Sequence, residues 1–131
     1  MFDIIEYEDR LRCWSVFRDK VCSLKDPVAE VIDWYSQAPC KSLQYDPWNK
    51  DQWPTPWELI FHNVYCAFTI TLGIVYTLQF CPLFKDNKFY LQICQEDNTG
   101  LVTYNFSINE KNYFNLDKKQ ILNTIKINHQ N

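Results

Sequence analysis

Residues 59–84 read LIFHNVYCAFTITLGIVYTLQFCPLF and contain no Asp, Glu, Lys or Arg. The residues just before this stretch are typical of a helix start, because Thr55 and Glu58 can form a reciprocal capping box and Pro56 suits the first helical position. We therefore predict one long helix over 56–80. A helix that is apolar on almost every side must be surrounded, either by the rest of a small domain or by lipid.

The composition favours burial of this helix at the centre of a single domain spanning residues 1–131. The chain is 47% hydrophobic and 22% charged, which is typical of a folding sequence long enough for one core. A bilayer-spanning segment at 64–84 is the alternative, since its length approaches the ~20 residues that a membrane helix needs. The lack of a flanking Lys/Arg cluster argues against that alternative. So do the polar residues inside the stretch, which are Thr69, Thr71, Thr77 and Gln79.

Hydrophobic periodicity predicts further helices at the two ends of the chain. Apolar residues recur every three or four positions over 3–24 and again from Asp26 to near Ala38, which predicts two helices packed as an antiparallel hairpin. Near the C-terminus, Asp117 and Gln120 can cap a short last helix. The apolar residues of that helix would be Ile121, Leu122 and Ile125.

Before this last helix the pattern changes to alternation, which is the period of a strand. Alternating side chains over 89–94 and 101–108, separated by turn-forming residues at 96–100, predict a hairpin of two strands, and 113–116 predicts a third. The sequence thus predicts an α+β fold. Its parts would be an N-terminal helical hairpin, a long central apolar helix, a three-stranded antiparallel sheet and a short C-terminal helix.

Composition also argues against several classes of function. The net charge of −3 and the lack of a basic cluster argue against nucleic-acid binding. With only two glycines, the chain has no glycine-rich loop for the phosphates of a cofactor. The two histidines and the spacing of the carboxylates offer no set of metal ligands. We therefore predict no bound cofactor and no metal site.

Six cysteines, at positions 13, 22, 40, 66, 81 and 94, leave two alternatives. An even number is compatible with disulfides. Against disulfides, the first residues do not resemble a signal peptide, no two cysteines form a CxxC pair, and most have apolar neighbours, where a free thiol behaves as a small hydrophobe. Reduced cysteines in the core of a cytosolic protein are therefore our prediction, with disulfides as the alternative.

The segment 39–57 has no hydrophobic period and is rich in proline and tryptophan, which indicates a stiff, ordered connection. It has two interpretations: a loop that covers the core, or an aromatic contact surface for a protein partner. The candidate partner-binding residues are Tyr45, Trp48 and Trp53. Because aromatic residues make up 17% of the chain, we expect some of them to reach the surface as anchors.

The best candidate for chemistry is Cys66, which lies four residues after His62 and so on the same face of the predicted helix. A thiol beside an imidazole is the minimal activated nucleophile. A Cys at the start of a helix that precedes an antiparallel sheet also resembles the core of transglutaminase-like cysteine hydrolases. That resemblance implies Cys66 as nucleophile and Asp117 as the third triad member. The strand at 101–108, where the family carries its catalytic His, has none, so the resemblance implies an inactive copy.

A second resemblance covers the whole chain. The string WPTPWEL at 53–59, together with DPVAEVIDWY at 26–35, is similar to small uncharacterised proteins of tailed phages that infect marine bacteria. The leading hypothesis is therefore a non-catalytic phage protein, in the virion or the host cytoplasm, that acts by binding another protein. The alternatives are a cysteine-dependent hydrolase or acyltransferase that uses Cys66, and a single-span membrane protein.

Overall fold

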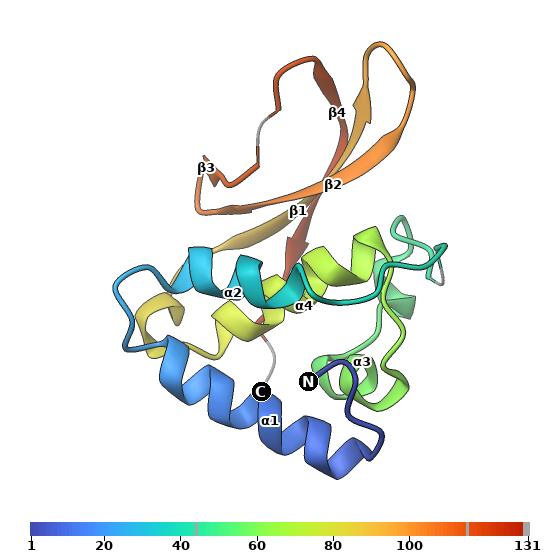
Figure 1. The fold of residues 1–131 in the computed structure, drawn as a ribbon. Coiled ribbons are helices and arrows are strands. Elements are labelled where there is room, and N and C mark those ends of the chain that lie inside the picture. The colour runs from blue at the N-terminus through green and yellow to red at the C-terminus, as the bar shows by residue number, and fades with distance from the viewer. Residues whose placement is uncertain (44, 115, 130–131) are drawn as a thin grey trace.

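The computed structural model describes residues 1–43, 45–114 and 116–129 and has an α+β fold, as predicted. A layer of helices packs against an antiparallel sheet, which extends away from the helices in Figure 1. The helical elements are α1 (Tyr7–Val21), α2 (Pro27–Tyr35), the 3-10 helix η1 (Lys50–Gln52), α3 (Pro56–His62), α4 (Ala67–Gln79) and the 3-10 helix η2 (Pro82–Phe84). The strands follow as β1 (Phe89–Glu96), β2 (Val102–Ile108), β3 (Lys111–Asn112) and β4 (Lys119–Ile127).

The sheet has the strand order β3-β2-β1-β4, and every neighbouring pair is antiparallel. β1 and β2 confirm the two strands predicted from alternation. One face of β1 is formed by Phe89, Leu91 and Ile93, which are 0% exposed and belong to the hydrophobic core. Because successive side chains of a strand point to opposite faces, Tyr90 and Gln92 lie on the other side of the sheet.

The predicted C-terminal helix is wrong, because that segment forms β4 and pairs with β1. The register of this pair shifts: Ile93 lies opposite Asn123, whereas Cys94 lies opposite Ile121. Leu122 is therefore an extra residue, and such a bulge bends the strand locally. The bulge also interrupts the alternation of apolar and polar residues by which a strand is recognised in a sequence.

The third predicted strand, 113–116, is also wrong in its position. β3 is only two residues long and ends at residue 112. Tyr113 and Phe114 lie outside the strands and pack their rings against Phe106 of β2, while Asn115 is outside the described residues. In the described part of the chain the sheet therefore has four strands, where the sequence predicted three.

The single helix predicted over 56–80 is wrong as well, because the chain forms two helices there, α3 and the longer α4. Asn63 ends α3 in the left-handed conformation, with a φ of 53°, which Asn tolerates better than most residues. The Asn63 side chain donates to the Phe2 carbonyl at 2.9 Å. Between the helices, the Tyr65 carbonyl accepts the Lys41 N–H at 2.8 Å. Contacts with distant parts of the chain thus fix the break.

Two predicted helix starts are confirmed. At the start of α3, Thr55 and Glu58 each accept a hydrogen bond from the other's backbone N–H, which completes the capping box. At the start of α2, the Asp26 carboxylate accepts the Ala29 N–H at 3.2 Å. Both caps depend only on residues within one turn, and such local signals are visible in a sequence.

α4 lies at the centre of the fold and carries no charged residue. Eleven of its 13 residues are buried, and it contacts α2 and α3 as well as β1 and β2 of the sheet. The chain runs in opposite directions along α1 and α2 (Figure 1), and the rings of Phe17 and Trp34 stack between them with centroids 3.8 Å apart. None of the described helices is long and apolar enough to cross a membrane.

The hydroxyl group of Thr77 joins three helices inside the core. It donates its proton to the Gly73 carbonyl, one turn earlier in α4, at 2.8 Å. It accepts the indole N–H of Trp14 from α1 at 2.9 Å and the O–H of Tyr35 from α2 at 3.1 Å. The one donor position and both acceptor positions of the Thr77 hydroxyl are thus used. Burial raises the pKa of Tyr35 to about 12, so that its hydroxyl keeps the proton it donates at neutral pH.

Two further features hold α1 and α2 against α4. Gly73 lets α2 approach closely, since a Cβ at this position would lie 2.6 Å from a ring carbon of Tyr35. Beyond the C-terminal end of α4, a disulfide joins Cys81 to Cys22, which directly follows α1. The prediction that the cysteines are reduced is therefore wrong for this pair. The free cysteines are Cys13, Cys40, Cys66 and Cys94.

A buried arginine holds the N-terminal segment to α3. Arg10 of α1 is 6% exposed, and its guanidinium donates to the carbonyls of Ile60 and Phe61 in the last turn of α3. The same group also donates to the carbonyls of Ile4 and Ile5. Unpaired carbonyls at the end of a helix carry partial negative charge and are favourable partners for a cation. These four bonds compensate for the burial of the charge.

Replacing Thr77 by Val should destabilise the protein much more than the same change at Thr71. Thr77→Val leaves the Trp14 N–H and the Tyr35 O–H without an acceptor, at a cost of about 1–3 kcal/mol for each buried donor. Thr71 is also buried, but its hydroxyl bonds only the Ala67 carbonyl of its own helix. Chemical denaturation of the two variants measures the difference in the free energy of unfolding. Equal losses would contradict the role of Thr77.

Candidate functional site

Cys66, the predicted nucleophile, is the N-cap of α4 and is 1% exposed. Its N–H donates to the Thr69 hydroxyl at 2.9 Å, and its Sγ lies 3.5 Å from the same oxygen. The position at the start of a helix agrees with the arrangement that the transglutaminase-like resemblance implies. The burial of Cys66 does not agree with that arrangement, because a nucleophile must be open to its substrate.

His62 and Asp117, the other predicted triad members, lie elsewhere in the fold. His62 is the last residue of α3 and is exposed, and Asn63 ends that helix before Cys66 is reached. The predicted four-residue spacing on one helix face therefore does not exist. Asp117 is exposed in the turn before β4, next to Lys118, whose carbonyl accepts the Asp97 N–H. That turn lies beside the β1–β2 connection.

On β2, where the resemblance requires a histidine, the residue near Cys66 is Tyr104. Its ring contacts Phe68, the second residue of α4, with centroids 5.7 Å apart. Burial raises the pKa of Tyr104, and the nearby Cys66 and Asp46 raise it further. A phenol with a raised pKa stays protonated at neutral pH, so it cannot accept the thiol proton as a general base. This geometry does not activate Cys66.

The three aromatic residues predicted to bind a partner fall into two groups. Trp53 packs its ring 5.5 Å from Phe68 and donates its indole N–H to the Pro47 carbonyl at 3.0 Å. Tyr45 is half-buried, and burial raises its pKa. Both thus help to cover the core. Trp48, by contrast, is 54% exposed. The segment therefore covers the core through Trp53 and Tyr45, whereas the partner contact at Trp48 stays a prediction.

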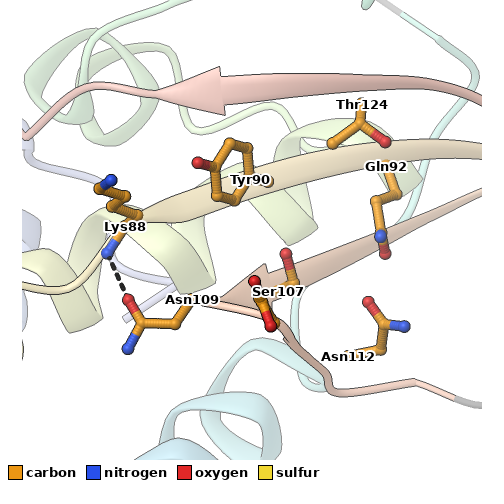
Figure 2. A pocket seen from close by; sticks show the side chains of 8 residues that line it. Lys88, Tyr90, Gln92, Ser107, Asn109, Asn112 and Thr124 are labelled. Carbon is orange, nitrogen blue, oxygen red and sulfur yellow. Dashed lines mark hydrogen bonds between the residues drawn. The ribbon is translucent and has the colours of Figure 1, made fainter.

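A polar hollow of about 660 Å³ lies on the face of the sheet opposite the core, and no pattern in the sequence predicted it. Figure 2 shows its side chains, in which the amide groups of Gln92 and Asn112 point toward each other. All four strands contribute, together with the turn between β2 and β3 and the residue just before β1. The lining residues are Lys88, Tyr90, Gln92, Ser107, Asn109, Glu110, Asn112 and Thr124.

Hydrogen bonds made by asparagine side chains hold the walls of this hollow. Asn105 donates its amide to Gln92 Oε1, and its own Oδ1 accepts the Phe114 N–H at 2.9 Å. Across the mouth, the Asn109 side chain accepts the Lys88 N–H at 2.9 Å (Figure 2). The sequence shows polar residues at alternate positions of β1 and β2. The path of the segment after β2, however, depends on these contacts between residues far apart in the chain.

Comparisons with known proteins find no family model, no curated protein and no solved structure that matches the chain. The resemblances to phage proteins and to transglutaminase-like hydrolases therefore stay predictions. In the described part of the chain, no group of three or more His, Cys, Asp or Glu residues could hold a metal ion.

Thiol labelling of the folded protein at neutral pH should modify Cys40 rapidly and leave Cys66 and Cys94 unmodified. Cys40 is exposed, whereas Cys66 and Cys94 are 1% and 0% exposed, so the latter two should react only after unfolding. Mass spectrometry of peptides from samples quenched at different times gives the rate at each position. Labelling of Cys66 as fast as that of Cys40 would show that the thiol is open to solvent and would restore the hydrolase hypothesis.

Proposed function

We propose that this chain is a non-catalytic binding protein, whose partner is another protein and whose main anchor is Trp48. The observation that carries the proposal is the exposure of Trp48, which is 54% of its surface, in a segment where Trp53 is packed against the core. Tryptophan is the residue type most enriched among the residues that dominate the energy of protein interfaces. The way in which the fold holds Trp48 gives further support.

The backbone around Trp48 is fixed on both sides. Asp46 accepts the Trp48 N–H on its carboxylate at 3.0 Å, and Pro47 is buried. The carbonyl of Pro47 is bonded to the indole N–H of Trp53, and η1 follows directly. A partner would therefore not have to order this loop on binding, and preorganisation of this kind increases affinity. Leu43, which is also 54% exposed, offers a second apolar contact in the same segment.

The class of partner follows from the resemblance to phage proteins. If the chain belongs to a tailed phage, its partner is a component of the particle or a protein of the bacterial host, and the chain acts in the virion or the host cytoplasm. The segment 53–59 that carries the resemblance directly follows η1 and includes the start of α3. The part of the sequence with the resemblance thus adjoins the segment that presents Trp48.

A second candidate function is a cysteine-dependent hydrolase or acyltransferase. The position of Cys66 at the start of α4, ahead of an antiparallel sheet, supports it. For catalysis, Cys66 would have to be uncovered, and a base other than Tyr104 would have to accept its proton. The burial of Cys66 favours the binding function over this alternative.

Two tryptophan variants separate binding from folding. Trp48→Ala should leave the free energy of unfolding within about 0.5 kcal/mol of the parent, as for most surface changes. It should weaken the complex by about 2 kcal/mol or more, which is about thirtyfold in Kd. Trp53→Ala is the matched control and should lower the free energy of unfolding by about 2–4 kcal/mol, because it removes a half-buried ring packed against the core.

The partner for this experiment is a protein captured from phage-infected bacteria, identified by mass spectrometry and then purified. Titration calorimetry with the purified partner gives Kd for the parent and both variants. Trp48→Ala binding with the parent's affinity, or unfolding as readily as Trp53→Ala, would refute Trp48 as the anchor.

A further inference from the structure

The polar hollow on the sheet presents hydrogen-bonding groups that the protein does not use itself. Among the described residues, the side chains of Tyr90, Ser107, Asn112 and Thr124 make no hydrogen bond within the chain, and Gln92 uses only its Oε1 atom, toward Asn105. These groups come from all four strands of the sheet and line one hollow. A set of unused donors and acceptors in a single hollow is the feature expected of a site for a polar ligand.

The charges of the lining exclude a strongly charged ligand. The hollow has one cation, Lys88, and one anion, Glu110, so that the lining is neutral overall. A phosphate or a nucleic acid would need several cations, and the carboxylate of Glu110 would repel it. The remaining groups are hydroxyls and amides, which can both donate and accept. Their natural complement is a neutral ligand with many hydroxyl groups.

The floor of the hollow is buried and fixed. Gln92 is 7% exposed, Ser107 is 4% exposed, and Asn105, which lies opposite Gln92 on β2, is 2% exposed. Hydrogen bonds to groups that are shielded from water and held in position are stronger and more selective than bonds to mobile surface groups. Beside this floor, the half-buried ring of Tyr90 offers a flat apolar surface for the C–H groups of a sugar ring.

The sheet itself is not available for an extended peptide at this place. Tyr90 of β1 is paired with Ser107 of β2 on one side and with Lys126 of β4 on the other. Ser107 is in turn paired with Asn112 of β3. A peptide that adds a strand needs a free edge with unpaired backbone groups, and Tyr90 and Ser107, on the inner strands β1 and β2, are paired on both sides. The ligand must therefore bind the side chains on the face of the sheet.

From these observations we infer that the hollow is a binding site for a neutral saccharide. Gln92 Nε2, the hydroxyls of Ser107 and Thr124, and the amide of Asn112 bind its hydroxyl groups, and the ring of Tyr90 packs against its apolar face. The volume of about 660 Å³ lies within the range of roughly 300–1,000 Å³ that is typical of small-molecule sites. This site is separate from the surface of Trp48 and does not depend on the proposed protein partner.

The test is an NMR titration of the ¹⁵N-labelled full chain with glucose, galactose and N-acetylglucosamine in turn, and with inorganic phosphate as the charged comparison. At least one sugar should shift amide signals of β1, β2 and residues 109–112, with a saturable curve. Asn112→Ala should weaken that binding about fivefold, the loss of one hydrogen bond. Asn98→Ala is the matched control, because Asn98 is an equally exposed asparagine in the β1–β2 turn, and should leave the binding unchanged.

Three results would overturn the inference. The first is that none of the three sugars shifts these signals at the highest concentration that dissolves. The second is that phosphate shifts the same signals more strongly than any sugar. The third is that Asn112→Ala and Asn98→Ala weaken sugar binding equally, which would place the ligand outside the hollow. Both asparagines are exposed, so both variants should fold, and the spectrum of each free variant checks this.

Discussion

The buried hydroxyl of Thr77 is the interaction on which the rest of the structure depends. It lies on a helix without any charged side chain and bonds α1 through Trp14 and α2 through Tyr35. Both partners are themselves buried, so each of the three polar groups satisfies the others where no water is available. The same junction requires Gly73, because any side chain there would overlap the Tyr35 ring. The Thr77 hydroxyl and the missing side chain of Gly73 thus set the positions of α1 and α2 against α4.

This closed core determines where function can lie. Cys66 is enclosed by the elements packed around the start of α4 and has Thr69 as its hydrogen-bond partner. Trp48 and the polar hollow are both outside the core, and hydrogen bonds hold each of them: the bond of Trp53 to the Pro47 carbonyl beside Trp48, and the bond of Asn105 to Gln92 beside the hollow. A rigid interior that presents fixed groups on its surface suits recognition better than a reaction that needs an open nucleophile.

The sequence predicts those parts of the fold that depend on neighbouring residues. The caps at Asp26 and Thr55 and the strands β1 and β2 follow from local patterns and are confirmed. The break between α3 and α4 could not be predicted, because it depends on Asn63 bonding Phe2, about sixty positions away in the chain. β4 was missed because the extra residue Leu122 disrupts its alternation. The hollow was missed because it is assembled from four strands and a turn, which lie far apart in the sequence.

The most direct test of a closed core around α4 is native-state hydrogen exchange of the backbone amides of residues 71–79, followed as denaturant is added. If the hydroxyl of Thr77 and the surrounding elements hold this helix, these amides exchange only through global unfolding. Their rates should then show the full denaturant dependence of that transition. Exchange through local openings that are insensitive to denaturant, while the sheet stays protected, would show that α4 opens independently and would contradict the account.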